Sequence, residues 1–184
     1  MKRTLIINGS PRKKGETSKV TAWIREHLEG EAKEVFTYDA DVHPCVDCRY
    51  CFDHPSCCRK DEMEEIYAYL QDCDHILFAS PIYFSELTGS FLNLASRFQP
   101  YFCGKFLRHE ESPLSKKKGA VLVMFGGSAR DTEKPYDTAR GLLELLNCRE
   151  ILPLVYGDHT DDIPALEQEK VLKGAAAIAA AFNA

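Results

Sequence analysis

The chain has 184 residues, of which 45% are hydrophobic, and it carries a net charge of −5. This length and apolar fraction suit one domain with a full hydrophobic core. The acidic balance argues against a nucleic-acid surface and no apolar run has membrane-spanning length, so we expect a cytoplasmic protein that binds neither nucleic acid nor membrane.

The first predicted strand, residues 4–7, leads through a polar turn at 8–18 into a predicted helix at 17–28. The turn holds two glycines, three cations and three hydroxyl side chains. Free backbone N–H groups at a helix N-terminus attract anions, and the turn lacks the spacing of a Walker loop or a dinucleotide fingerprint. We therefore predict a phosphate site here. Its side-chain donors are expected to be Ser10, Arg12, Thr17 and Ser18.

Further apolar runs alternate with segments of helical periodicity along the rest of the chain. The remaining predicted strands are 34–38, 75–79, 120–125 and 151–155. The remaining predicted helices are 61–71, 88–101, 134–146 and 164–182. Strands that are apolar at consecutive positions indicate a sheet covered on both faces. We predict an α/β protein, a three-layer α/β/α sandwich with five parallel strands in the order 2-1-3-4-5 and a ligand beyond strands 1 and 3.

The interruption at about 39–60 carries closely spaced cysteines. The chain has eight cysteines, many for a cytoplasmic protein, where clustered thiols more often serve metal or redox chemistry than disulfides. The spacing is C-x2-C-x2-C-x5-C with Cys58 as a spare neighbour. Its members are Cys45, Cys48, Cys51 and Cys57.

Two later turns are expected to meet the phosphate turn at the same edge of the sheet. Extended backbone and aromatic faces in the first suit a flat heterocycle, and paired glycines in the second allow close approach of a ligand. The first turn contains Pro81, Ile82, Tyr83 and Phe84. The second contains Gly126, Gly127 and Ser128. Aromatic packing under a helix and an ordinary glycine turn are the alternative explanations.

Taken together, these motifs resemble the NAD(P)H-dependent FMN reductase family of flavodoxin-like proteins. They are Asn-Gly-Ser-Pro-Arg-x-x-Gly-x-Thr-Ser near the start, Ser-Pro-Ile-Tyr after the third strand and Gly-Gly after the fourth. The resemblance covers roughly residues 1–130 and implies one flavodoxin-like domain over 1–184 with a cysteine-rich insertion at about 39–60. It implies FMN, with the phosphate at the first turn and the ring along the other two. Glu16 stands where relatives usually carry Asn, and a carboxylate beside a phosphate is unfavourable unless it points away.

The resemblance also implies an activity. The expected protein is an oxidoreductase that takes a hydride from NADH or NADPH through FMN and passes electrons to a quinone, a flavin, another small acceptor or a redox protein. The flavin carries the chemistry, so no catalytic side chain is required. The alternative is a flavodoxin-like or iron-sulfur flavoprotein electron carrier that acts on partner proteins, and a cysteine-rich interaction module is a third class. The habit of the family and an aromatic-rich end of helix 88–101 imply a homodimer or higher oligomer.

The cysteine spacing resembles the compact motif of iron-sulfur flavoproteins, a branch of the same family whose cysteines hold a [4Fe-4S] cluster. Closely spaced thiolates on an irregular loop can reach separate irons of one cube. Many flavin-only relatives keep cysteines at this place, and zinc sites usually pair two C-x2-C units across a longer spacer. Bare thiols, structural or redox-active, rank first among the alternatives, a cluster second and zinc last.

Overall fold

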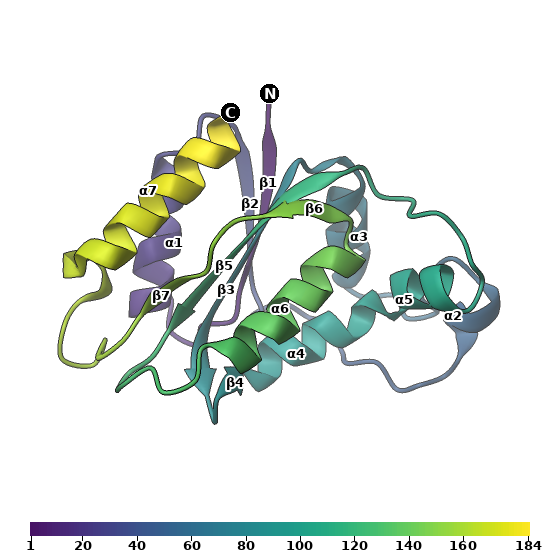
Figure 1. The fold of residues 1–184 in the computed structure, drawn as a ribbon. Coiled ribbons are helices and arrows are strands. Elements are labelled where there is room, and N and C mark those ends of the chain that lie inside the picture. Colours follow the sequence, from purple (N-terminus) through teal and green to yellow (C-terminus); the bar gives the residue numbers. More distant parts are fainter.

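A computed structural model describes all 184 residues and shows helices on both faces of a mostly parallel sheet (Figure 1). The main strand order is β2-β1-β3-β5-β6, which confirms the predicted sandwich with order 2-1-3-4-5. These strands are β1 (Arg3–Asn8), β2 (Glu31–Phe36), β3 (His75–Tyr83), β5 (Lys117–Met124) and β6 (Cys148–Ile151). The sheet has seven strands rather than five. The additional strands are β4 (Glu86–Leu87), a hairpin partner of β3, and β7 (Val155–Gly157), which pairs with β5.

The predicted last strand, residues 151–155, differs most from the structure. It is split between β6 and β7, and residues 152–154 belong to neither strand. Pro153 has no N–H to donate to a neighbouring strand, which explains a break at this position. The predicted second strand, 34–38, is also displaced, because β2 begins earlier in the chain and ends at Phe36.

Helices cover the two faces of the sheet (Figure 1). On one face α1 (Glu16–Glu26) and α7 (Glu169–Asn183) contact each other. On the other side lie α3 (Met63–Asp72), α4 (Gly89–Ala95), α5 (Gln99–Phe106) and α6 (Glu133–Leu145). The predicted helix at 88–101 is two helices, because the 3-10 turn η1 (Ser96–Phe98) separates α4 from α5. The short helix α2 (Tyr50–Asp53) lies inside the cysteine segment and was not predicted.

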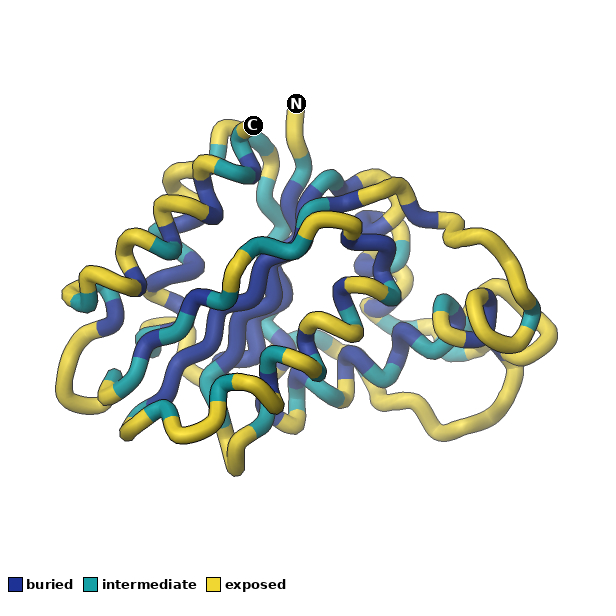
Figure 2. The backbone as a smooth tube through the Cα atoms, viewed as in Figure 1, coloured by how far each residue is buried: buried dark blue, intermediate teal, exposed yellow.

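The sheet separates two hydrophobic cores. Leu5 and Ile7 of β1 belong to the larger core, on the side of α4, whereas Ile6 between them belongs to the smaller core, on the side of α1 and α7. Successive strand side chains point to opposite faces, so a sheet covered twice needs apolar residues at every position. Figure 2 shows the central strands β1, β3 and β5 buried along most of their length, with exposure concentrated on the edge strands, outer helix faces and loops. The continuous apolar runs in the sequence follow from this arrangement.

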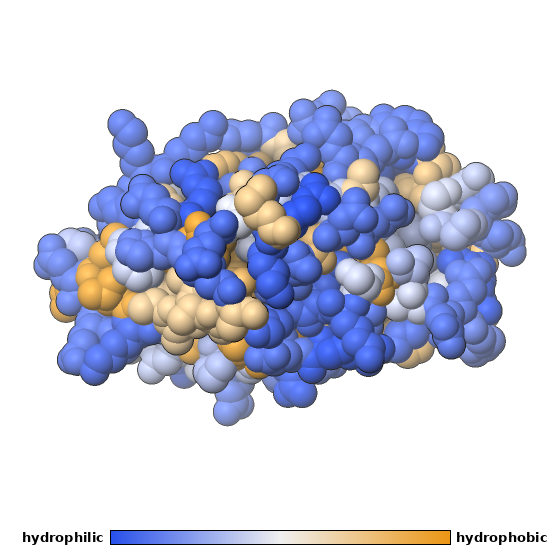
Figure 3. Space-filling view, turned by 90° about the horizontal axis from the view of Figure 1, so that it is seen from above, coloured by the Kyte–Doolittle hydropathy of each residue, from blue (hydrophilic) through white to orange (hydrophobic).

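The edge of the sheet that carries both chain ends is the one seen from above in Figure 3. Its surface is mainly hydrophilic, with small apolar patches between charged side chains. None of the helices combines the length and apolarity needed to cross a bilayer. The carboxyl ends of β1, β3 and β5 lie at the opposite edge, where the turns that follow these strands come together.

A buried threonine joins two of these turns. Thr88 precedes α4, and its hydroxyl donates to the carbonyl of Gly9 at 2.9 Å and accepts from the N–H of Phe91 at 3.4 Å. The first bond holds the turn after β1 against the start of α4, and the second caps the helix. A Cβ at Gly9 would stand only 2.9 Å from this hydroxyl oxygen, so the close approach needs glycine.

We expect Thr88→Ala to lower the free energy of unfolding by about 1–2 kcal/mol, because it removes a helix cap and a buried bond between segments. Urea denaturation measures this loss. Thr132→Ala is the matched control, since Thr132 precedes α6 but forms no side-chain cap. A surface change of that kind costs within about 0.5 kcal/mol. Equal losses in the two variants would contradict the role given to Thr88.

Candidate functional site

A cavity of about 250 Å³ lies at the carboxyl edge of the sheet, where three turns meet. The predicted residues that line it are Ser10, Arg12, Thr17, Pro81, Ile82, Tyr83 and Gly126. A second hollow of about 240 Å³ adjoins it and shares Ile82 and Gly126 with it. Gly127 and Ser128 line this second hollow. Most of the residues expected to bind a ligand are therefore adjacent in space, although they come from three distant parts of the sequence.

The turn after β1 is held by its own side chains. The Ser10 hydroxyl accepts from the N–H of Arg12 at 3.2 Å and donates to its carbonyl at 3.0 Å. The Ser18 hydroxyl donates to the same carbonyl at 2.9 Å and accepts from the Asn8 amide at 3.3 Å. Ser18 does not line the cavity, so it shapes the turn from behind, and Ser10 both shapes the turn and borders the cavity.

The beginning of α1 leaves donors without protein partners. Gly15 precedes the helix and supplies no side-chain cap, so the first N–H groups of α1 have no partner within the helix. Thr17 is buried, lines the cavity and forms no side-chain hydrogen bond with the protein. These donors, together with the positive end of the helix dipole, favour an anion in the cavity.

The charges around this turn leave one unpaired cation at the cavity. Lys13 forms an ion pair with Asp39 at 2.8 Å, whereas the Arg12 guanidinium has no ion-pair or hydrogen-bond partner and lines the cavity. Glu16 borders the same cavity, but its carboxylate accepts from the N–H of Ala165 at 2.6 Å and pairs with Lys19 at 2.5 Å. The Glu16 carboxylate is thus bound by protein donors, as a carboxylate beside a phosphate site has to be.

The β3–β4 hairpin presents its aromatic residues to solvent rather than to the core. Phe84 and Ser85 form its two-residue turn, and both have positive φ, at 54° and 60°. This is the type I′ geometry that Asn-Gly sequences favour, so a phenylalanine here is strained. Phe84 is fully exposed and lines neither hollow, while Tyr83 is 43% exposed and lines the cavity. Neither aromatic ring is buried under α4, so the alternative explanation of core packing does not apply to them.

Two cavity residues come from a turn that the sequence analysis did not single out. Thr160 and Asp161 follow β7 and line the cavity beside Gly126. Thr160 donates through its N–H and its hydroxyl to the carbonyl of Phe125, at 3.0 and 2.9 Å, and the Asp161 N–H donates to Gly126. A Cβ on Gly126 would collide with Asp161, so this glycine serves close packing of two turns. The sequence signal that could have identified them is a polar turn after the last strand, because that turn lies at the same edge of the sheet as the other turns that line the cavity.

The cysteine segment forms a separate pocket beside α5. It is small, about 20 Å³, and its cysteines are Cys45, Cys48, Cys51, Cys57 and Cys58. The sulfurs of Cys48 and Cys58 are 3.3 Å apart, and those of Cys51 and Cys103 are 3.5 Å apart. All eight cysteines of the chain are free, and no three metal-ligating side chains surround a common point. The thiols are neighbours but do not converge as a preformed metal site.

The thiols of this segment differ in acidity. A hydrogen bond from the backbone N–H of Tyr50, and a second one from Cys58, lower the pKa of Cys48. The same hydrogen bond between the two thiols raises the pKa of Cys58. Burial and the neighbouring Cys103 raise the pKa of Cys51 to about 12. Because thiolates are the nucleophiles and the metal ligands, Cys48 is the most readily activated of these three.

One buried ion pair closes the cysteine segment. Arg97 in η1 is 1% exposed, and its Nη1 donates to Asp61 at 2.6 Å and to the carbonyl of His43 at 2.8 Å. Burial opposes the charge of Asp61, but its hydrogen bonds with Arg97 and with the N–H of Met63 lower the pKa of this carboxyl. His43 and Asp61 flank all five pocket cysteines in the sequence, so one side chain holds both ends of the segment.

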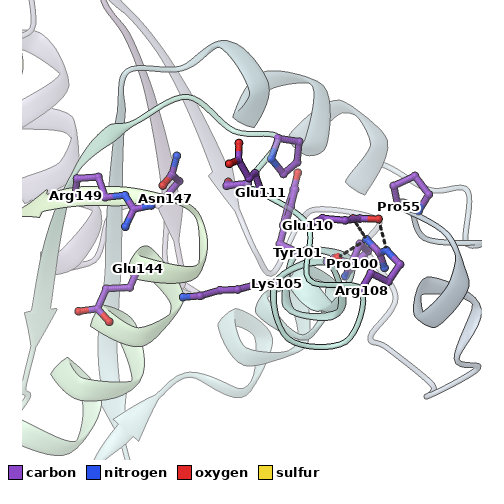
Figure 4. Close-up of a pocket in the computed structure, with 13 residues that line it drawn as sticks. Pro55, Pro100, Tyr101, Lys105, Arg108, Glu110, Glu111, Glu144, Asn147 and Arg149 are labelled. Carbon is purple, nitrogen blue, oxygen red and sulfur yellow. Dashed lines mark hydrogen bonds and ion pairs between the residues drawn. The ribbon is translucent and has the colours of Figure 1, made fainter.

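The largest cavity, about 630 Å³, lies elsewhere, between α5, the segment after it and the end of α6 (Figure 4). Cationic and acidic side chains both border it, and Arg108 pairs with Glu110 at 2.7 Å on one side. Arg108 also donates to the carbonyl of Cys51, which fixes the cysteine segment to the end of α5. None of the residues predicted to bind a ligand lines this cavity, so we assign no function to it on the basis of its size.

Comparison with known proteins agrees with this architecture. The family model for NADPH-dependent FMN reductases matches residues 2–162. An iron-sulfur flavoprotein of Archaeoglobus fulgidus is 27% identical over 92% of this chain and 73% of its own length. An iron-sulfur flavoprotein of Methanosarcina thermophila is 30% identical over 70% of this chain and 65% of its own length. The chain thus spans about two thirds to three quarters of these relatives.

Solved structures show the same fold at low identity. An NAD(P)H:quinone oxidoreductase from Methanothermobacter marburgensis superposes with a TM-score of 0.72 at 14% identity, over 99% of this chain and 96% of that one. An FMN-dependent NADH-azoreductase from Bacillus anthracis, solved with FMN, has a TM-score of 0.63 at 12% identity, over 99% and 98% of the two chains. These similarities establish a flavodoxin-like fold, as expected from the sequence.

Proposed function

Since the chain belongs to the NADPH-dependent FMN reductase family and is an FMN-dependent NAD(P)H oxidoreductase, we propose that the cavity at the carboxyl edge of the sheet binds the FMN. The observation that carries this proposal is the free Arg12 guanidinium beside Thr17 and the uncapped start of α1. Three kinds of donor without protein partners face one cavity, and a phosphate monoester accepts from all of them.

The chain's own residues bind and orient in this mechanism. Bound FMN supplies the chemistry, by accepting a hydride from NAD(P)H and passing electrons on. Arg12, Thr17 and the N–H groups at the start of α1 would hold the phosphate, while Ser10 and Ser18 keep the turn in shape. Pro81, Ile82 and Tyr83 on one side, and Gly126, Gly127 and Ser128 on the other, border the room left for the ring.

The acceptor that best fits this site is a small flat molecule such as a quinone. Two open hollows adjoin one another, with the exposed faces of Tyr83 and Phe84 at the hairpin beside them. Aromatic faces of this kind stack on flat rings. A quinone oxidoreductase and an azoreductase are among the proteins that share the fold, which supports the same class of acceptor.

We expect Arg12→Ala to weaken FMN binding about ten- to a hundredfold, because it removes a charge-assisted contact worth roughly 1.5–3 kcal/mol. Riboflavin, which lacks the phosphate, should bind both proteins equally. Flavin fluorescence titration measures both affinities. Lys14→Ala is the control, since this neighbouring cation is exposed and does not line the cavity. An equal loss for FMN and riboflavin would place the phosphate elsewhere.

A second candidate function is an iron-sulfur flavoprotein electron carrier, and the cysteine pocket favours it. Cysteine thiolates are the ligands that iron-sulfur clusters take, and five cysteines line this pocket. To bind iron, Cys48 and Cys51 would have to give up their contacts with Cys58 and Cys103. The pocket also lies near the proposed flavin cavity, because the two are joined by α4. Thr88, just before this helix, contacts Gly9, and Ser96, just after it, accepts a hydrogen bond from the N–H of Cys45. A seven-residue helix is about 10 Å long.

If Cys45, Cys48, Cys51 and Cys57 hold a [4Fe-4S] cluster, protein prepared without oxygen and with iron supplied should contain about four irons per chain. Cys48→Ala should abolish iron binding and leave FMN bound, because the two sites use separate backbone segments. Cys73→Ala, a buried thiol outside the pocket, should keep the iron. Iron and sulfide analysis with absorption spectra decides this. Wild-type protein without iron and labile sulfide would leave the flavin-only reductase.

The free cysteines also support a cellular location. All eight lack disulfide partners, and thiols persist in this form in the reducing cytoplasm. A dehydrogenase-type reaction needs NAD(P)H, which the same compartment supplies. We therefore propose that the protein acts in the cytoplasm.

We also propose a homodimer or higher oligomer, supported by the exposed end of α5. Phe102 and Phe106 are 41% and 50% exposed and pack on each other, although Phe98, expected in the same patch, is buried. Light scattering at micromolar concentration should show more than one chain per particle. Replacing both exposed phenylalanines by serine should shift the protein toward monomer, because apolar interfaces lose their driving force. A wild-type monomer would refute the proposal.

A further inference from the structure

Arg97 is a buried cation, and three of the five N–H groups of its guanidinium have no partner in the protein. Both hydrogen bonds of its guanidinium involve Nη1, while Nε and Nη2 are buried and have no partner in the protein. Nε carries one N–H and Nη2 carries two. Buried charged donors without acceptors are costly and rare in folded proteins, so this arrangement calls for an acceptor that the polypeptide does not supply.

The surroundings of these donors indicate what that acceptor is. Arg97 lines the cysteine pocket together with Cys45, Cys48, Cys51 and Cys57. Burial lowers the pKa of Arg97, but the Asp61 carboxylate and the neighbouring Tyr67 and Cys57 raise it, and the net effect is a raised pKa. The side chain therefore stays charged. Asp61 is its one carboxylate partner, and Tyr67 donates to its backbone carbonyl instead.

We propose that Arg97 is the positioning residue of the cysteine pocket, with Nε and Nη2 donating to the sulfur atoms of an anionic iron-sulfur group held by the four cysteines. This inference rests on the cluster proposed above. Four thiolates give such a group a net negative charge, and a buried guanidinium offsets it with directed hydrogen bonds. Lysine could not do the same, because its ammonium lacks the planar fork that serves Asp61 and the pocket together.

The proposal has a measurable consequence for redox chemistry. When the group accepts one electron, no bond is broken and the pocket gains one negative charge. A nearby buried cation stabilises this more negative form, so Arg97 raises the reduction potential. The electron can come from the flavin, which the family's reaction supplies with electrons from NAD(P)H. Arg97 would thus ease electron transfer from the flavin cavity to the cysteine pocket.

The test compares the one-electron reduction of iron-loaded protein in four forms, followed by electron paramagnetic resonance during a redox titration. The double variant Arg97→Gln with Asp61→Asn avoids leaving a carboxylate unpaired in the interior, and Asp61→Asn alone is its reference, because it removes the same negative charge and keeps Arg97. We expect the equilibrium constant for reduction of the double variant to lie at least about tenfold below that of Asp61→Asn, or ~59 mV for one electron. Arg49→Gln is the control, because this cation borders the same pocket but its side chain is 70% exposed and screened by solvent.

The outcomes separate this inference from the cluster itself. A double variant that binds iron with the same potential as Asp61→Asn overturns the role of Arg97 and leaves the cluster standing. Wild-type protein that binds no iron overturns both. If the double variant does not fold, Arg97→Lys replaces it: the charge stays but the fork is lost, so iron content or potential should fall below wild type. A wild-type potential with full iron in the lysine variant also overturns the inference.

Discussion

The functional edge of this protein depends on the parallel pairing of β1 with β3 and of β3 with β5. Parallel strands end at the same side of a sheet, so the turn after each strand is brought beside the others. Residues more than 100 positions apart in the sequence, such as Arg12 and Gly126, therefore line one cavity. The helices that cross over between strands bury both faces and keep this edge open.

In the proposed anion site, most polar side chains of the turn after β1 are already engaged by protein partners. The hydroxyls of Ser10 and Ser18 are used to shape the turn, Lys13 pairs with Asp39, and Glu16 is held by Ala165 and Lys19. What stays free is Arg12, Thr17 and the start of α1. A rigid turn with few unsatisfied donors suits a ligand better than a flexible turn with many, because less ordering is needed on binding.

The helix α4 links this site to the cysteine pocket. Its first residue follows Thr88, which contacts the turn after β1, and its last turn runs into η1, where Arg97 holds both ends of the cysteine segment. The same short element thus fixes the cavity at the carboxyl edge and the cysteine pocket relative to each other.

Local pattern was enough to predict the alternation of strands and helices and the strand order, and most residues of the predicted site lie at one edge of the sheet, because two-sided burial and strand-end turns leave period and composition signals. It carries no information where the position of a residue depends on distant partners. Thr160 and Asp161 join the cavity through hydrogen bonds with Phe125 and Gly126, Ser18 turns away from it, and Phe84 points into solvent. Cysteine spacing likewise marked the segment, whereas only tertiary structure brought Arg97, from a helix break some 40 residues later, into contact with it. Cysteine spacing depends only on neighbours along the chain, whereas the partners of the buried Arg97 charge, His43 and Asp61, are brought to it by the fold.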